Sequence, residues 1–378
     1  MSGVPTRRAA PPLVVRAADA ADRGAWDAFV ARLPSADPLQ AWDWGAVAAT
    51  GGERPERWLA SDADGHLRGV AQVLVREATA GRGPFATHRV LYVPHGPAWD
   101  AGAADGAAVL ATLLGGLREL GRREQGIVLK CDPRATAGTS AEQLATLLRA
   151  HGLRRARADL QAPTTRVVDL RAGSAAVFAG LEKDTRNLVR RSAREGVRSR
   201  VVRDGDRAAY AAFAALLAQT GSRAGFRVRP RAAFEAIAAT FGARGDAYLV
   251  LAELDDRPIA GCLTLAVGPR AFYLYAASLR EPGLRHAHGA YAALWGCVEA
   301  LAADGRESLD LWGVAEAEDA SADPAWAGFS LFKRGFGGTP LRHPGTFDLV
   351  LSPAWYLIRD LREQLRRRWG RPAPGRGA

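Results

Sequence analysis

Lysine is rare in this sequence, and one of its few lysines lies in a segment suited to chemistry. The 378-residue chain has 51 basic residues, yet lysine occurs only at Lys130, Lys183 and Lys333, and arginine fills the other basic positions. A lysine kept where arginine is so strongly preferred is a candidate for a role that arginine cannot fill, because burial can shift the pKa of its compact ammonium. Lys333, set among aromatic residues and glycines, is the first candidate for a catalytic cation.

Arginines gather in two segments that are expected to be helical. Arg186, Arg190, Arg191 and Arg194 share one helix face, and a second cluster stands at 366–368. With a formal net charge of +11, such faces favour contact with the phosphates of RNA or with acidic lipid headgroups at a membrane surface. A solvated basic face is the alternative for both.

Cysteine and histidine usage gives no sign of a metal site. Cys131, Cys262 and Cys297 are an odd number without metal-ligand spacing, and they are expected to be buried reduced thiols. His286 and His288 form an H-x-H pair without an evident third ligand, so no metal is expected. No apolar run approaches the ~20 residues of a membrane span, and the first residues contain charges and prolines, so we expect a cytoplasmic chain.

One order of elements occurs twice along the chain: helices, antiparallel strands, then a strand, a helix and a strand. The expected elements are a helix at 26–33, strands at 56–60, 69–76 and 88–93, a helix at 105–120 and a strand at 126–131, then helices at 208–219 and 231–240, strands at 247–253, 258–267 and 271–278, a helix at 289–303 and a strand at 308–312. This pattern predicts an α/β fold with mixed sheets flanked by helices. The order is similar to that of the N-acetyltransferases.

The repeat predicts two tandem domains. The first is expected to span 13–158 and to be completed by the C-terminal segment 343–369, and the second is expected to span 159–342, with disordered tails at 1–12 and 370–378. A C-terminal helix is expected at 353–369. Its apolar face is expected to pack on the first half, and that face comprises Ala354, Leu357, Ile358, Leu361 and Leu365.

Seven short motifs follow one another along the chain. They are Leu39–Trp44, Leu91–Asp100, Leu129–Pro133, Gln161–Leu170, Lys183–Val197, Asp310–Gly313 and Phe329–Gly338. Together they resemble the FemABX family, which transfers amino acids from aminoacyl-tRNA to peptidoglycan precursors. Two departures stand out: the long helical arm of the staphylococcal members is absent, and Ala46–Thr50 lacks the basic residue that some members carry there.

The resemblance implies a tandem GNAT-like fold and an aminoacyltransferase that uses aminoacyl-tRNA as co-substrate and needs no cofactor. Attack of an amine on an ester needs help in removing a proton and a positive donor for the oxyanion. Lys333 is the expected positive group, and Asp100 is the expected base or amine-orienting carboxylate. The alternatives are a solvated loop lysine and a turn aspartate, and substrate-assisted proton transfer also stays open.

A further set of residues resembles family positions that line the acceptor site. These residues are Trp44, Arg223, Phe226, Arg229 and Tyr275. Core packing is the alternative for the aromatic residues, and solvated loop positions are the alternative for the arginines. On this reading, Arg186, Arg190 and Arg191 contact tRNA phosphates, and Lys333 meets the substrates in a cleft between the two domains.

Three other functions remain to be tested. An acyl-CoA N-acyltransferase is disfavoured because the segment at 285–290 does not match the Q/R-x-x-G-x-G/A loop that binds pyrophosphate. A non-catalytic RNA-binding protein has only the charge in its favour. The third is tRNA-dependent transfer to a secondary metabolite, in which the reaction is the same and only the acceptor differs. The expected partners are aminoacyl-tRNA and a nucleotide- or lipid-linked precursor, for a monomer that is cytoplasmic or peripheral at the inner membrane face.

Overall fold

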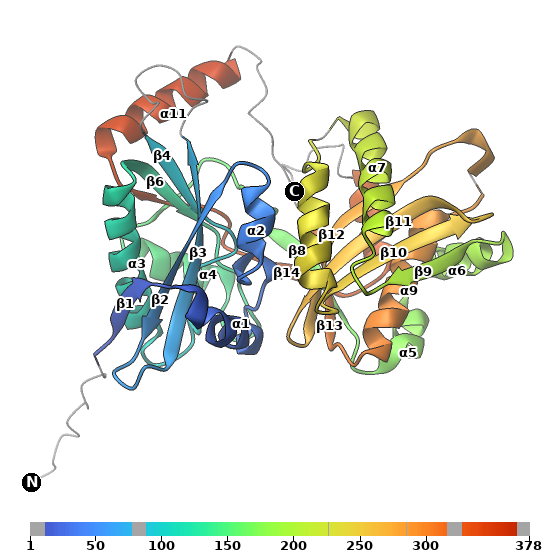
Figure 1. Cartoon of the computed structure of the whole chain (residues 1–378), viewed down its shortest axis with the longest axis horizontal. Coiled ribbons are helices and arrows are strands. Elements are labelled where there is room, and N and C mark those ends of the chain that lie inside the picture. The colour runs from blue at the N-terminus through green and yellow to red at the C-terminus, as the bar shows by residue number, and fades with distance from the viewer. Residues whose placement is uncertain (1–11, 78–87, 226, 285, 316–326, 369–378) are drawn as a thin grey trace, which may run out of the picture.

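Two α/β lobes lie side by side along the long axis of the molecule (Figure 1). The computed structural model describes residues 12–77, 88–225, 227–284, 286–315 and 327–368. The first lobe has an eight-stranded sheet in the order β1-β2-β3-β4-β6-β15-β7, with β5 paired to β3, and the second has a seven-stranded sheet in the order β14-β8-β13-β12-β11-β10-β9. Both sheets mix parallel and antiparallel pairs, which confirms the expected α/β architecture.

The first lobe combines the N-terminal elements with the C-terminal end of the chain. Its elements are β1 (Val14–Ala17), α1 (Arg23–Arg32), α2 (Trp44–Ala49), β2 (Arg54–Ser61), β3 (Leu67–Glu77), β4 (Arg89–Val93), β5 (Ala98–Trp99), α3 (Gly106–Arg123), β6 (Gly126–Cys131), α4 (Ala141–Ala150), β7 (Arg154–Arg155), β15 (Phe347–Val350) and α11 (Pro353–Arg368). Because β15 pairs with both β6 and β7, the end of the chain returns to this sheet.

The second lobe is continuous in sequence. Its elements are β8 (Thr164–Asp169), α5 (Gly173–Gly180), α6 (Lys183–Arg194), β9 (Arg198–Val202), α7 (Arg207–Ala224), α8 (Arg231–Ile237), β10 (Ala247–Leu254), β11 (Arg257–Val267), β12 (Arg270–Ser278), α9 (Gly289–Ala303), β13 (Ser308–Gly313), α10 (Ala327–Gly335) and β14 (Thr339–Arg342). The expected helices and strands of the repeat are all present, with ends that differ by a few residues.

Local sequence explains the elements that frame the site. Helix α3 buries the apolar positions that recur every three or four residues, including Leu110, Leu113 and Leu117, so one side of it packs on the sheet. The hairpin between β10 and β11 turns on Asp255 and Asp256, both with positive φ, as a two-residue hairpin turn requires.

The two sheets differ where their parallel strands meet. In the second lobe, β12 and β13 pair only between Arg270–Phe272 and Ser308–Asp310, although β12 continues to Ser278 and β13 to Gly313. In the first lobe, the corresponding strands β4 and β6 stay paired along the whole of β4. The sheet of the second lobe therefore opens at this point, whereas the sheet of the first lobe stays closed.

One apolar cluster extends through both lobes. It contains Trp26 and Trp44 from the first lobe and Phe213, Phe234 and Tyr275 from the second. Lobes that share a large apolar interface are held in a fixed relation, whereas small polar interfaces allow domain motion. Positions on the two sides of this interface can therefore contribute to one site.

Several expectations about the periphery need correction or lie outside the described residues. Lys333 lies in helix α10 and not in a loop. The face of α11 that was expected to pack on the first half is exposed at Leu357, Ile358 and Leu361. The three cysteines are buried and free, as expected. The expected disordered ends at 1–12 and 370–378 fall almost wholly outside the described residues. No helix in the described part of the chain is long and apolar enough to span a membrane.

Candidate active site

Lys333 is buried at the point where β12 and β13 separate. Its side chain is only 2% exposed, and Nζ donates a hydrogen bond of 2.8 Å to the carbonyl oxygen of Gly313, the last residue of β13. The same nitrogen lies 5.7 Å from the ring centroid of Tyr273 on β12 and 4.0 Å from that of Phe329 on α10. The ammonium thus touches both strands where their pairing ends.

The surroundings of Lys333 are unusual for a buried cation. Burial lowers the pKa of Lys333 from its ordinary value of 10.5 to about 7, and the negative charge of Asp310 limits the fall. Among the described residues, Gly313 O is the only hydrogen-bond acceptor of Nζ, and no carboxylate forms an ion pair with it. An ammonium has three donors, so this site holds a cation with unused hydrogen-bonding capacity.

Burial of Lys333 should make the free energy of unfolding depend on pH. Because its folded pKa of about 7 is below the ordinary 10.5, the unfolded chain binds more protons between these values, and the penalty fades as pH rises through this window. Replacing Lys333 with methionine should therefore raise the free energy of unfolding by about 4 kcal/mol more at pH 6 than at pH 10. Urea unfolding at both pH values measures the difference; an equal effect at both would contradict the lowered pKa.

The alternation of side chains along β12 shows which face of the sheet Lys333 occupies. Phe272 and Tyr275 join the apolar cluster that faces the first lobe, whereas Tyr273 joins the cluster on the opposite face. Phe332, on α10, packs against that second cluster. Lys333 therefore approaches the gap from the face turned away from the first lobe. The sequence-based expectation placed Lys333 in the cleft between the lobes, whereas its neighbour Tyr273 belongs to the cluster on the opposite face of the sheet.

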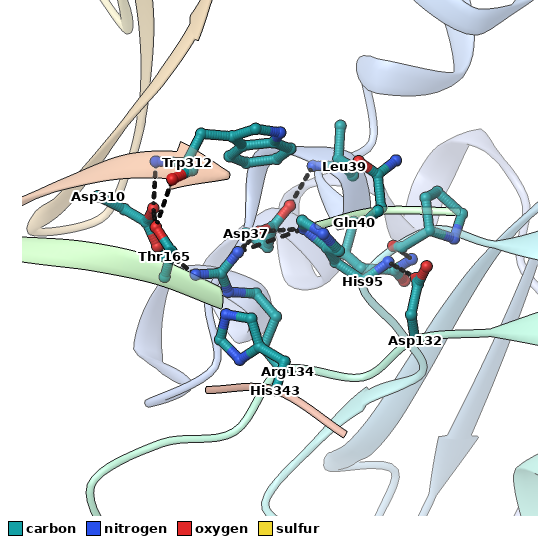
Figure 2. Close-up of polar contacts among 12 residues, drawn as sticks. Asp37, Leu39, Gln40, His95, Asp132, Arg134, Thr165, Asp310, Trp312 and His343 are labelled. Atoms are coloured by element: carbon teal, nitrogen blue, oxygen red, sulfur yellow. Dashed lines mark hydrogen bonds and ion pairs between the residues drawn. The ribbon is translucent and has the colours of Figure 1, made fainter. Parts of the chain in front are cut away.

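A buried polar network occupies the other side of the gap (Figure 2). The guanidinium of Arg134, which follows β6, forms ion pairs with Asp37 of the first lobe, at 3.2 Å, and with Asp310 on β13 of the second lobe. Nδ1 of His95 lies 2.8 Å from Asp37, and its ring packs 4.8 Å from that of Trp312. One buried arginine thus joins the carboxylates of the two lobes.

Besides its ion pair with Arg134, Asp310 holds the end of β13 in place. Its carboxylate accepts hydrogen bonds from the hydroxyl of Thr165 and, at 2.7 Å, from the backbone N–H of Trp312. Trp312 has a φ of 60°, which is rare for a bulky residue and needs support from its surroundings. Gly313, whose carbonyl binds Lys333, comes directly after it. The network therefore holds the strand end that supplies the acceptor for Lys333.

The chain is similar in sequence to known transferases. A family model described as "Acetyltransferase (GNAT) domain" matches residues 180–324. The Lipid II:glycine glycyltransferase of Staphylococcus saprophyticus subsp. saprophyticus is 27% identical over 242 residues, which is 62% of this chain and 55% of that protein. The enzyme of the same name from Staphylococcus haemolyticus is 27% identical over 239 residues, which is 62% of this chain and 54% of that protein. The chain thus spans about half the length of these curated relatives.

Solved structures extend the similarity to most of the chain. The crystal structure of FemX superposes with a TM-score of 0.76 at 20% identity and covers 89% of this chain and 98% of that one. A tandem GNAT protein from the clavulanic acid biosynthesis pathway gives a TM-score of 0.52 at 16% identity over 91% of this chain and 99% of its own. The chain is similar to members of the FemABX family in sequence and in fold. Its two lobes have the tandem GNAT fold.

The glycines around Lys333, in the motif that resembles the FemABX family, serve packing rather than chemistry. A Cβ on Gly335 would lie 2.1 Å from the hydroxyl of Thr185 on α6, so only glycine allows the two helices to approach. Gly338 has a φ of 78°, and a Cβ there would lie 2.8 Å from the carbonyl oxygen of Val167. The motif thus places Lys333 by close packing of α10 and the following turn on α6 and β8.

Part of the expected acceptor set converges between the lobes. The guanidinium of Arg229 lies 5.1 Å over the ring of Trp44, which belongs to the first lobe. Burial raises the pKa of Tyr275, and the neighbouring charge and hydrogen bond of Arg229 oppose the rise. Arg223 is exposed and donates to the backbone carbonyl of Ser278. Phe226 lies outside the described residues.

Asp100 lies in the first lobe, in an exposed turn after β5. Its carboxylate accepts a hydrogen bond of 3.0 Å from the backbone N–H of Gly102, which is the local geometry of a turn aspartate. No hydrogen bond or ion pair joins it to Lys333, and both residues lie in the described part of the chain. The structure does not bring the two expected catalytic residues into contact.

The expected phosphate-binding arginines on α6 have different surroundings. Arg186 donates to the carbonyl oxygens of Ala179 and Leu181, so its guanidinium supports the end of α5. Arg190 is exposed and lies 5.1 Å from the ring of Phe178. Arg191 pairs with Glu195, which directly follows the helix. Arg190 is the member of this set best placed for a ligand.

The buried network of Arg134, Asp37 and His95 was not predicted from the sequence. Asp310 lies in a motif that was recognised, and Arg134 comes directly after another, so proximity to motifs was the available signal. Neither the burial of these side chains nor their meeting across the lobes can be read from spacing alone, since Arg134 and Asp310 are 176 positions apart.

Proposed function

We propose that this chain is an aminoacyltransferase that moves an amino acid from aminoacyl-tRNA to the amine of a peptidoglycan precursor stem peptide. The names of the curated relatives support a lipid-linked precursor and glycine as the first substrates to test. The observation that carries the proposal is the buried ammonium of Lys333 at the gap between β12 and β13. Such a reaction uses no further cofactor, and it places the chain in the cytoplasm, where charged tRNA is made.

The proposed chemistry needs a cation at the ester carbonyl. The neutral acceptor amine attacks the carbonyl carbon, a C–N bond forms, and the ester C–O bond to the tRNA 3′ oxygen then breaks. The amine loses one proton and the leaving oxygen gains one, so the reaction consumes no net proton. The intermediate carries an oxyanion, which the unused donors of Lys333 are placed to stabilise in a site shielded from water.

The gap has two sides, which lie on opposite faces of the second-lobe sheet. Lys333 and α10 define the donor side, where the aminoacyl ester is proposed to lie. Trp44, Arg229 and Tyr275 define the acceptor side between the lobes. The acceptor amine is proposed to reach the ester through the opening between the strands. All the groups invoked come from one chain, so the proposal requires only a monomer.

A direct test supplies both substrates at once. The chain is incubated with a mixture of charged tRNAs and with nucleotide-linked and lipid-linked precursors, and the products are measured by mass spectrometry. The proposal predicts a precursor heavier by one amino-acid residue and dependent on charged tRNA. Transfer to a small metabolite alone would show that the acceptor is not a cell-wall precursor. Consumption of acetyl-CoA without any dependence on tRNA would contradict the proposal.

Arg229 should contribute to acceptor binding. Its Nε is buried without a hydrogen-bond partner among the described residues, so a donor is available for an anionic ligand between the lobes. Arg229→Ala should raise KM for the precursor about tenfold with little change in kcat, because a charged hydrogen bond is worth about 1.5 kcal/mol or more. Arg227→Ala, two positions away and exposed, is the matched control. Equal KM values for the two variants would remove Arg229 from the acceptor site.

A further inference from the structure

Helix α11 is held on the first lobe by only one of its sides. The Tyr356 hydroxyl donates a hydrogen bond of 2.7 Å to Asp348 on β15, and the guanidinium of Arg154 lies 3.9 Å from the Tyr356 ring. Asp360 forms an ion pair of 2.8 Å with Arg157. Figure 1 shows the helix lying across one end of the lobe, beyond β4 and β6. These contacts fix which way the opposite side of the helix faces.

The side of α11 turned away from the lobe is apolar. Leu357, Ile358 and Leu361 are 66%, 44% and 56% exposed, and their spacing places them on one stripe of the helix. They are half of the exposed large hydrophobic residues in the described part of the chain, and the other three are Val14, Phe329 and Leu331. Apolar side chains gathered on one exposed helix face indicate a surface that contacts another apolar phase.

The surroundings of this stripe are basic. The sequence of α11 has five arginines against Asp360 and Glu363, and among the side chains that the structure describes, Arg362 is exposed. Beside the helix, Arg118 and Arg122 of α3 line a cavity of about 520 Å³ that also borders Trp355 of α11. An exposed apolar stripe with arginines around it has the chemistry of a helix that lies flat in the interface of a bilayer with acidic headgroups.

We propose that α11, together with Arg118 and Arg122, is a docking surface for a membrane that contains anionic lipids. Charge complementarity selects this occupant. A second copy of the chain would bring two helices of the same net positive charge together, which is unfavourable. The proposal goes beyond the proposed function and does not depend on it, because lipid binding can be measured without any turnover.

The test is flotation of the full chain with vesicles of phosphatidylcholine alone or of phosphatidylcholine with phosphatidylglycerol. The wild-type chain should float with the anionic vesicles, and added salt should weaken this binding. The double substitution Leu357→Asp and Leu361→Asp should lower the bound fraction about tenfold, and the milder Leu357→Gln and Leu361→Gln pair should lower it less. The charge reversals Arg118→Glu and Arg122→Glu should also lower it.

Val14→Asp is the matched control, since Val14 is 55% exposed on β1, at the edge of the same lobe. This variant should float like the wild type. Three results would overturn the proposal: no flotation of the wild type with anionic vesicles, equal flotation of the wild type and the double-aspartate variant, or a concentration-dependent dimer in light scattering that the double-aspartate variant abolishes.

Discussion

Alanine at position 333 is expected to lower kcat/KM at least about a hundredfold while the protein stays folded. The loss follows from removal of the Lys333 ammonium at the gap between β12 and β13, because a single donor to an oxyanion contributes a factor of about 10² to 10³. The tRNA-dependent transfer assay measures the effect. Arg334→Ala, at the next position of α10, is the control for loss of a positive charge from this helix and should leave turnover near that of the wild type.

The pH dependence of the same reaction separates two roles for Lys333. If the charged form stabilises the oxyanion, kcat/KM must lose this contribution as pH rises through the pKa of about 7 in the free enzyme. Lys333→Arg keeps the charge at all accessible pH values, so it should retain part of the activity and lose this alkaline decline. A neutral Lys333 that acts as a base predicts the opposite limb, with activity lost as pH falls through 7. Near-normal activity of Lys333→Ala would exclude both roles.

Removal of Arg134 should cause the largest loss of stability. Arg134→Ala leaves the carboxylates of Asp37 and Asp310 buried without their shared cation, and breaking a buried pair from one side costs about 3–5 kcal/mol. Urea unfolding measures the free energy. The reason for the large value is desolvation, since both carboxylates are almost completely removed from solvent.

A second ion pair between the lobes provides the control. Arg244 of the second lobe pairs with Asp43 of the first, but its side chain is 35% exposed and Arg23 also contacts Asp43. Arg244→Ala should therefore cost no more than about 1 kcal/mol. Equal free energies of unfolding for the two arginine variants would show that burial does not make the Arg134 network more stabilising than the exposed ion pair.

The elements of this fold were predictable because each one has a local signal. The apolar spacing of α3 and α9 identified two helices that cover the sheets, and short runs of Val, Leu and Tyr identified the strands. Repetition of the same order then indicated two lobes. Helices α4 and α5 were missed. Gly335, Gly337 and Gly338 end α10 within a few residues of Lys333, so the local sequence favours a loop there and does not predict this helix.

The direction in which a helix face or a side chain points was less predictable than the helical periodicity of the sequence. The spacing of Leu357, Ile358 and Leu361 showed that they share a face of α11, but it did not show that Tyr356 and Asp360 hold the other face against the lobe. Lys333 was found from residue rarity and its motif, yet its approach from the far face of the sheet depends on the alternation along β12. Such outcomes depend on tertiary contacts between distant residues.

The central claim is that the Lys333 ammonium is buried at the gap in the second-lobe sheet with its pKa lowered to about 7. Because the chain has only Lys130, Lys183 and Lys333, NMR titration of protein labelled with ¹⁵N at the lysine side chains should resolve each of them. The account predicts one resonance that titrates near pH 7 and is missing from Lys333→Arg. Titration of all three lysines near the ordinary value of about 10.4 would contradict it.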